Sequence, residues 1–486
     1  MAHRTLVWFR GKDLRLHDHR PLALALSGGD VIPVFVLDPF FFSPARAQAL
    51  PHRMQFLLES IAGLRDELAA RGSELLLVPG KSVEVIPDLA ARLEVDRVVA
   101  QRWVEPFARE RDRRVKQALG DRFQLLEGET LLPPGTLRTG SGKPYSVFSQ
   151  FAKAFRREVE VGSPLLAPKQ LPPVPAKVLT QVTRASLPTL DELGIRYNGA
   201  LSPGGERAAN QRLRAFRLGA AASYHLQRDR MDIPGTSRLS ADLKFGTLSP
   251  RQVWYEIERA HRGTEAADKY LNELVWREFS HSTLWDRPEL LREPFRVDFV
   301  GFPWRTPEHA PEHWQAWVNG TTGYPVVDAA ARQLLQEGFV HNRARMIAAS
   351  FLTKHLLITY RAGEQHYMKF LTDGDWAQNN AGWQWSAGCG CDAQPYFRVF
   401  NPMLQGERFD PEGDYVRKYV PELAGLPAGV IHTPWEAPAL VLKAAGVTIG
   451  ETYPAPIVDH AVARERFLML AKQHMAARKG GSEVKA

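Results

Sequence analysis

The chain has 486 residues, of which 44% are hydrophobic and 24% are charged. This is the composition of a soluble globular protein, and no stretch approaches the roughly 18 apolar residues of a membrane span. The length predicts two or three domains, and the net charge of +8 favours nucleic acid, and after it an anionic membrane, as a partner.

The first 130 residues alternate short apolar runs with helical patterns. The start, MAHRTLVWFRGKD, has no apolar run long enough for a signal peptide. Five runs predict strands, at Thr5 to Phe9, Val31 to Leu37, Glu74 to Val78, Arg97 to Ala100 and Phe123 to Leu126. Helical patterns such as Met54 to Arg71 and Val83 to Leu93 lie between them. The alternation predicts a five-stranded parallel, Rossmann-like sheet covered on both faces. A charged loop, RGKDLRLHD, follows the first strand in place of the GxGxxG of a dinucleotide-binding unit.

Residues 131–205 form a segment rich in proline and glycine, as in LLPPGTLRTGSGKPY and LLAPKQLPPVPAK. Such a composition predicts a long connection with little regular structure of its own. We therefore place the end of the α/β domain at residue 130 and the start of the next domain at residue 206.

Residues 206–478 show helical spacing of apolar residues. The patterns lie at Ala208 to Leu226, Pro250 to Arg262, Asp268 to Trp285, Val326 to Glu337 and Asn342 to Leu357. Because no strand-rich block and no repeat of fixed period occurs, an all-α domain is predicted. The last residues, 479–486, are polar and predict a frayed tail.

Most of the 12 tryptophans lie in this helical half. Tryptophan commonly fills a core, but its flat ring also suits a bound flavin or an unstacked base, and in redox proteins it relays electrons. Composition alone leaves these three interpretations open.

The segment Asp373 to Pro402, DGDWAQNNAGWQWSAGCGCDAQPYFRVFNP, is dense in Asp, Asn, Gly and Trp and lacks a clear helical period. We interpret it as a shaped loop that serves a site. Asp373 and Asp375 are close enough to bind a sugar, a metal or a basic partner, but no further ligands surround them at metal-ligand spacing, so no metal is predicted. Cys389 and Cys391 are too close in sequence for an unstrained disulfide, and we expect reduced thiols in a cytoplasmic protein.

Two short helical stretches place polar groups on one face. In LNELVWREF, Glu273, Trp276 and Arg277 share a face, either as an intrahelical ion pair or as groups presented to a ligand. In HNRARM, Asn342, Arg345 and Met346 share a face, while Arg343 points elsewhere and could meet a phosphate.

The motifs in chain order resemble the cryptochrome/photolyase family, specifically its class I cyclobutane pyrimidine dimer photolyases. They are LVWFRGKDLRLHD, GTSRLSADLKFGTLSPRQV, LNELVWREF, TGYPVVDAAARQL, HNRARMIAASFLTKHLL, DGDWAQNNAGWQW and DAQPYFRVFNP. The resemblance covers nearly the whole chain.

The resemblance implies FAD bound in the helical domain. The residues that match the family's flavin contacts are Tyr224, Thr236, Ser237, Arg238, Leu239, Ser240, Arg277, Asn342, Arg345, Asp373, Asp375 and Asn379. Hydroxyls, backbone N–H groups and an adjacent helix start at 236–240 suit a pyrophosphate. Arg345 and Asp373 match an ion pair against the isoalloxazine ring. Asn379 matches the residue facing the redox-active ring nitrogen, where many cryptochromes carry Asp or Cys.

The resemblance also implies a pocket for a flipped-out pyrimidine dimer. Its predicted residues are Glu273, which would hydrogen-bond the damaged base, with Trp276, Trp385 and Met346. Arg228, Arg343 and Arg398 match DNA-contact positions, on single- or double-stranded DNA, and should bind phosphate without sequence preference. The implied reaction is electron donation from light-excited, reduced anionic FAD to the dimer, after which the cyclobutane ring opens.

Two departures from the family pattern concern the electron relay and the antenna. Of the three relay tryptophans that are usual in the family, Trp383 and Trp304 match the inner and outer positions, but Tyr360 replaces the middle one. This predicts slower or rerouted photoreduction. A second chromophore, folate or deazaflavin, is expected in some members, but QRWVEPFARERD lacks the Asn-Glu pair expected for folate, and its identity stays open.

Three alternatives remain. A cryptochrome that signals without repair is disfavoured by Asn379, Met346 and Glu273, and a (6-4) photolyase is disfavoured by HNRARM, where that class has histidine. A flavin electron-transfer protein that does not use DNA is disfavoured by the basic charge. We expect a monomer with no protein or membrane partner.

Overall fold

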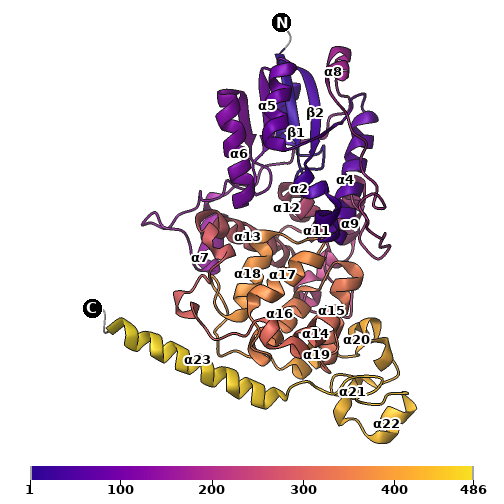
Figure 1. Cartoon of the computed structure of the whole chain (residues 1–486), viewed down its shortest axis with the longest axis vertical. Coiled ribbons are helices and arrows are strands. Elements are labelled where there is room, and N and C mark those ends of the chain that lie inside the picture. The colour runs from indigo at the N-terminus through magenta and orange to yellow at the C-terminus, as the bar shows by residue number, and fades with distance from the viewer. Residues whose placement is uncertain (1–2, 484–486) are drawn as a thin grey trace. The chain divides into compact units, whose positions relative to one another are not determined.

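The structure is a computed structural model that describes residues 3–483, with side chains to residue 478. Figure 1 labels the helices and strands of the chain, which forms two compact units. The first unit contains residues 1–225, 236–288 and 372–377, and the second contains residues 226–235, 289–371 and 378–486. The α/β sheet and the helices as far as residue 288 therefore belong to the same unit.

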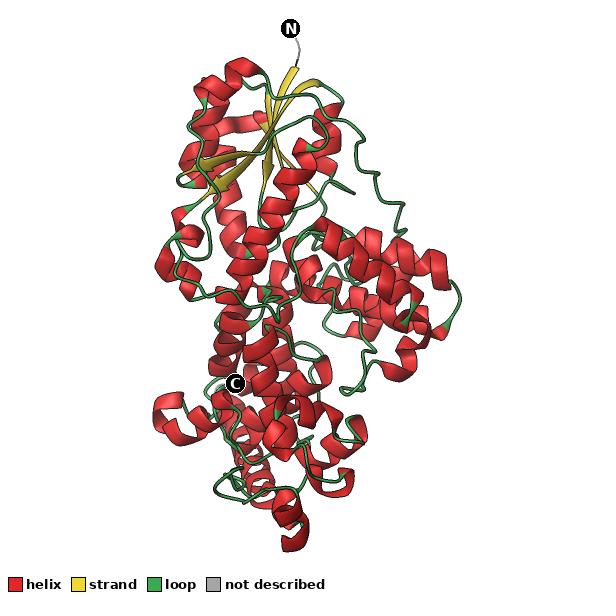
Figure 2. Cartoon of the chain, turned by 90° about the vertical axis from the view of Figure 1, so that its right-hand side faces the viewer, coloured by secondary structure: helices red, strands yellow, loops and turns green. Residues whose placement is uncertain are grey.

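The first unit holds a five-stranded parallel sheet in the order β3-β2-β1-β4-β5. The strands are β1 (His3–Phe9), β2 (Gly29–Leu37), β3 (Leu76–Pro79), β4 (Arg97–Gln101) and β5 (Phe123–Leu126). Figure 2 shows these strands as one sheet with helices on both sides. The predicted sheet is confirmed, with strand ends that differ by a few residues from the prediction.

Alternate residues of the strands build two cores, one on each face of the sheet. On one face Leu6 and Trp8 pack with residues of α5 (Ser82–Arg92) and α6 (Pro106–Leu119). On the other face Val7 and Phe9 pack with residues of α1 (Arg20–Leu26), α4 (Pro51–Ala69) and α11 (Ser240–Phe245). Burial on both faces explains why the strands are continuous apolar runs.

The connection between the predicted domains has more structure than its composition predicted. It contains α7 (Phe148–Glu158) and α8 (Ala176–Gln181). In α7 the buried Phe151 and Phe155 are four residues apart, which is helical spacing, between two segments rich in proline. The local apolar period outweighs the composition of the flanking residues.

The remaining helices that lie wholly or partly in the first unit are α2 (Pro39–Phe42), α3 (Pro44–Gln48), α9 (Glu206–Leu218), α10 (Tyr224–Gln227), α12 (Pro250–His261) and α13 (Glu265–Asp286). The predicted helix at 208–226 is interrupted, because α9 ends at Gly219 and a short 3-10 turn (Ala220–Ser223) precedes α10. Glycine is common at such helix ends.

The second unit is built from α14 (Pro311–Asn319), α15 (Pro325–Glu337), α16 (Asn342–Ser350), α17 (Tyr360–Phe370), α18 (Trp376–Ala387, whose first two residues belong to the first unit), α19 (Pro402–Phe409), α20 (Asp414–Tyr419), α21 (Ala428–Ile431), α22 (Ala439–Ala444) and α23 (His460–Glu483). A π-helical turn, Phe351–His355, continues α16. No helix within residues 3–483 is both long and apolar enough to cross a membrane.

Two predictions about irregular structure in this unit were wrong. The segment expected as a loop after Asp373 contains α18, whose buried face mixes polar with apolar side chains. Asn380 and Gln384 both donate to the Leu290 carbonyl oxygen, so the helix shows no apolar period in the sequence. The expected tail from residue 479 is helical as far as Glu483, and residues 484–486 lie outside the described chain.

Candidate functional site

Helix α13 carries the Glu273, Trp276 and Arg277 group of the first unit. Thr264 caps the helix by accepting a hydrogen bond from Ala267 N–H. The Trp276 ring lies parallel to the ring of Phe148 at a centroid distance of 3.6 Å. Arg277 is buried and donates to the Glu129 carbonyl oxygen at 2.6 Å. Phe148 and Glu129 are thus neighbours that the sequence did not indicate.

The loop before α11 holds the predicted pyrophosphate residues. Arg238 in this loop has a φ of +53°, a left-handed conformation that costs a non-glycine residue about 1 kcal/mol or more and is typical of functional loops. Tyr270 packs edge-on against Tyr224 at 5.1 Å and hydrogen-bonds Ser237. Burial raises the pKa of Tyr270, which therefore stays a neutral donor beside this loop.

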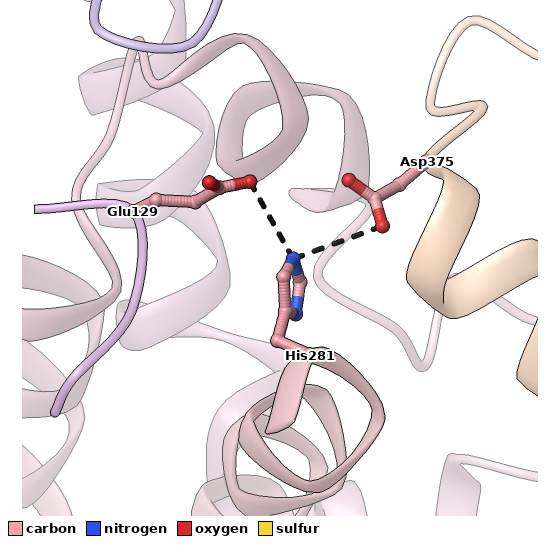
Figure 3. A group of neighbouring side chains, drawn as sticks. All are labelled: Glu129, His281 and Asp375. Carbon is pink, nitrogen blue, oxygen red and sulfur yellow. Dashed lines mark ion pairs between the residues drawn. The ribbon is translucent and has the colours of Figure 1, made fainter. Parts of the chain in front are cut away.

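A buried group of charges surrounds Lys12 in the same unit; we call Lys12, Glu105, Glu129, His281 and Asp375 the Lys12 cluster. The Lys12 ammonium lies 2.5 Å from Glu129, 2.8 Å from Asp375 and 2.9 Å from Glu105. Figure 3 shows His281 from α13 pointing between Glu129 and Asp375, with its Nε2 atom 3.5 and 3.7 Å from their carboxylate oxygens.

The charges of this cluster stabilise one another. Burial would lower the pKa of Lys12, but Asp375, Glu105 and Glu129 outweigh it and hold that pKa well above its usual value. Burial would raise the pKa of Asp375, but Lys12 and His281 hold it well below its usual value. Lys12 is therefore a permanent cation and Asp375 a permanent anion across the physiological pH range.

The structure corrects the sequence-based prediction that no further metal ligands lie near Asp375. We expected no further ligands nearby, yet ligand atoms of Glu129, His281 and Asp375 all lie within 4.8 Å of one another. The partners come from distant parts of the chain, which spacing cannot reveal. The Lys12 ammonium already supplies a cation to Glu129 and Asp375.

Helix α16 of the second unit places the predicted HNRARM residues. Arg343 lies 2.8 Å from Asp229 and covers the Phe409 ring at 4.2 Å. Arg345 donates from Nε to the Val340 carbonyl oxygen at 2.8 Å. Asn342 and Met346 are in contact, with Nδ2 and Sδ 3.6 Å apart. Asp373 belongs to the first unit, so the expected Arg345–Asp373 ion pair stays a prediction.

Asn379 and Trp383 lie one turn apart on α18. The Asn379 amide Nδ2 donates to the Glu364 carbonyl oxygen at 3.0 Å. This bond fixes the orientation of the Asn379 carboxamide, whose Oδ1 atom can accept a hydrogen bond. The Trp383 side chain is 3% exposed. Trp385, expected to line the dimer pocket, is half-buried.

The aromatic contacts around Trp383 include residues outside the predicted three-residue relay. The rings of Tyr360 and Trp304 meet edge-on at 5.5 Å. Trp383 also has Tyr367 as a ring neighbour at a centroid distance of 5.1 Å and Trp317 at 6.0 Å, and Trp317 stacks on Trp314 at 5.6 Å. No individual role was predicted from the sequence for Trp314 or Trp317. Their spacing of three residues, which places both on one face of a helix, could have indicated that they lie close together.

The other predicted DNA-contact residues lie at the surface of the second unit. Arg398 is exposed, and its backbone carbonyl accepts from the buried Lys354 ammonium at 2.7 Å. Arg228 is half-buried beside Asp229. Lys354 therefore anchors the backbone that presents Arg398.

Comparison with known proteins finds similarity over nearly the whole chain. Residues 5–176 match the family model described as DNA photolyase, and residues 270–473 match that described as FAD binding domain of DNA photolyase. A deoxyribodipyrimidine photo-lyase of Agrobacterium fabrum is 42% identical over 474 residues, which is 96% of each chain.

Two solved structures have the same architecture. A bacterial class III photolyase from Agrobacterium tumefaciens matches with a TM-score of 0.89 and 39% identity over 98% of each chain. A Synechocystis cryptochrome matches with a TM-score of 0.87 and 30% identity, over 97% of this chain and 99% of its own. Since the similarity extends over nearly the full length and includes both family models, the chain belongs to the DNA photolyase family.

Proposed function

We propose that this protein repairs cyclobutane pyrimidine dimers in DNA by light-driven electron transfer from bound FAD. The observation that carries the proposal is the full-length similarity to proteins named deoxyribodipyrimidine photo-lyase. The sequence motifs resemble class I photolyases, whereas one similar solved structure is a class III photolyase. The photolyase class of this protein therefore stays a prediction.

The chemistry of the donor set suits FAD. The hydroxyls of Thr236, Ser237 and Ser240 can bind a pyrophosphate, and the strained Arg238 backbone is consistent with a loop shaped for a ligand. The oriented Asn379 oxygen suits a ring N–H, as a reduced flavin presents. The residues proposed to form the flavin pocket are Tyr224, Thr236, Ser237, Arg238, Leu239, Ser240, Arg277, Asn342, Arg345, Asp373, Asp375 and Asn379.

Of these, Arg277 and Asp375 act within the protein. Arg277 holds the Glu129 backbone and Asp375 holds Lys12. We therefore propose that these two residues shape the pocket wall rather than recognise the flavin by direct hydrogen bonds.

Bound, reduced FAD would supply a photoexcited electron to the dimer and would take it back once the cyclobutane ring has opened, so that the reaction is redox-neutral overall. The protein positions the lesion: Glu273 hydrogen-bonds the damaged base, and Trp276, Trp385 and Met346 provide apolar walls that exclude water. A dimer pairs and stacks poorly in a duplex, so extruding it costs less than extruding intact bases.

Arg228, Arg343 and Arg398 are proposed to bind DNA phosphates. Such contacts add affinity without reading sequence, which suits an enzyme whose target occurs at any pair of adjacent pyrimidines. We also propose a cytoplasmic monomer. A folate or deazaflavin antenna on the α/β domain stays a prediction without an assigned identity.

The second candidate function is cryptochrome signalling, favoured by the similarity to the Synechocystis cryptochrome. One assay separates the two. Purified, FAD-loaded protein is illuminated with DNA that carries cyclobutane dimers, and restored thymine is quantified against a dark control and a (6-4) photoproduct substrate. Light-dependent recovery from cyclobutane dimers alone is expected, and no recovery with flavin bound and reduced would refute the repair function.

A further inference from the structure

We propose that Lys12, in the α/β part of the chain, is a positioning residue for the flavin-binding loop at residues 372–377. The inference rests on the proposed function, because that loop carries Asp373 and leads into the helix that carries Asn379. It assigns to the α/β sheet a role in holding FAD that is independent of any antenna chromophore.

The position of Lys12 is fixed from its backbone outward. It follows strand β1 by three residues, and its carbonyl oxygen accepts from the Gln101 side chain at 2.8 Å. A Cβ atom at Gly246 would lie 2.0 Å from the same oxygen. Only glycine therefore fits where this backbone packs, and the Lys12 side chain starts from a rigid base and is 2% exposed.

The Lys12 ammonium reaches the loop through Asp375. One carboxylate oxygen of Asp375 accepts from Lys12 at 2.8 Å, and the other accepts from the Ala377 N–H at 3.0 Å. The second bond makes Asp375 the N-cap of α18, because it satisfies a backbone donor of the first turn. Asn379 follows within the next turn of that helix, so Lys12 orients the cap from which this helix starts.

A second cation from the α/β part acts on the same loop. Arg53 in α4 donates from Nη1 to the Gly374 carbonyl oxygen at 3.3 Å. Gly374 and Asp375 are thus held by side chains more than three hundred positions earlier in the chain, and Asp373 precedes them directly.

The cluster does more than stabilise the fold. A buried ion pair gains little net stability over apolar packing, since both charges lose hydration, whereas removing one partner leaves a buried charge uncompensated. Without Lys12, the Glu129 and Asp375 carboxylates would face each other with His281 between them. Asp375 would turn toward water, and the start of α18 would move with it.

The test compares FAD binding by the full-length protein with Lys12→Met, which keeps most of the stem and removes the charge. We expect the FAD dissociation constant to rise by roughly tenfold or more. We also expect the vibronic structure of the flavin absorption band and the flavin reduction potential to change, which a uniform loss of stability would not cause. Glu105→Gln is the matched control, because Glu105 lies 2.9 Å from Lys12 and, within the described part of the chain, no hydrogen bond or ion pair joins it to residues 372–377. The Lys12 ammonium keeps the Glu129 and Asp375 carboxylates as partners in this variant, so the FAD dissociation constant should change by less than about twofold.

A double-mutant cycle isolates the contact. Asn caps helices as well as Asp does, so Lys12→Met combined with Asp375→Asn should bind FAD more tightly than Lys12→Met alone. Strictly additive effects, or a Lys12→Met variant with the affinity and spectrum of the unmodified protein, would overturn the proposal. If Lys12→Met does not fold, Arg53→Met provides the same test at Gly374. We expect this variant to lose less FAD affinity than Lys12→Met, and an unchanged affinity would count against the proposal. Failure of the unmodified protein to bind FAD would instead refute the proposed function.

Discussion

Tyr360 occupies the middle position of the predicted electron relay, where it behaves differently from a tryptophan. An oxidised phenol must release its proton, and burial, together with Cys389, raises the pKa of Tyr360. Tyr360 is 3% exposed, so bulk solvent has little access to that proton. Trp317 and Trp314 offer a second path outward from Trp383 in the same unit.

Photoreduction of oxidised FAD should therefore respond to both paths. Tyr360→Trp should accelerate photoreduction, and Trp317→Phe in the unmodified protein should slow it by about tenfold, which corresponds to a barrier higher by roughly 1.4 kcal/mol. The rate is measured from flavin absorbance under blue light with an external reductant. Repair by chemically reduced enzyme should stay unchanged in both variants, and no gain from Tyr360→Trp would refute the role of that position.

Glu278 makes stability depend on pH. Burial raises the pKa of this carboxyl from 4.5 to about 7, although Arg277 opposes the shift. The folded state therefore favours the protonated form, and the stability from this group is complete below about pH 4.5 and is lost as the pH rises through about 7.

Glu278→Gln removes this titration and keeps an oxygen that can accept from the Leu131 N–H. The variant should be more stable than the unmodified protein at pH 8, by up to about 3 kcal/mol, and nearly equal to it at pH 4.5. Denaturant unfolding at both pH values measures the difference. An equal effect at both values would show that packing, and not ionisation, decides it.

At the scale of elements, helices α17 and α18 approach each other through a glycine. A Cβ atom added at Gly363 in α17 would lie 2.2 Å from the Trp383 ring and 2.7 Å from Leu352. The absence of a side chain therefore sets where Trp383 sits, one turn after Asn379. At Gly382, on α18, an added Cβ atom would meet no other atom within 4 Å.

Gly363→Ala should destabilise the protein by about 1–3 kcal/mol, because the core must shift to admit the methyl group. It should also reduce the photoreduction rate, since Trp383 is displaced. Gly382→Ala is the matched control and should be neutral or stabilising by up to about 1 kcal/mol. Both effects are read from denaturant unfolding and flavin absorbance; a Gly363→Ala variant that matches the control would contradict this account of the packing.

At the scale of the whole molecule, the net charge of +8 should give DNA binding that weakens steeply with salt. Arg343 contributes to this charge only in part, because Asp229 lies 2.8 Å away and neutralises it. A DNA phosphate must compete with Asp229 for the guanidinium.

Opposite substitutions in this pair should have opposite effects on DNA affinity. Arg343→Ala should weaken binding and reduce the slope of log affinity against log salt by about 1. Asp229→Asn should strengthen binding to damaged and undamaged DNA alike, because it frees the arginine. Fluorescence anisotropy over a salt series measures both. If neither variant changes the slope, Arg343 does not contact phosphate.

The sequence alone determined the elements whose apolar residues form a local pattern, either a continuous run or a helical period. Strands β1 to β4 are largely apolar on both faces and so appear as continuous runs, and most helices of the second half show apolar spacing of three and four. The family resemblance likewise depends on short local motifs, which a single sequence displays. Local patterns failed at α18, where buried Asn380 and Gln384 replace apolar residues, and at α7, where flanking prolines masked a helix.

Only the tertiary structure decided which distant charges meet. Lys12 and Asp375 are 363 positions apart, and Lys12 and Glu129 are 117 apart. No periodicity links such residues, because a buried ion pair is selected by the packing of whole elements and not by the conformation of neighbouring residues. The same reason applies to Trp383, whose ring neighbours were set by the glycine in α17. Spacing along a chain reports which face of an element is buried, whereas the partner on the other side of that face is known only once the elements have packed.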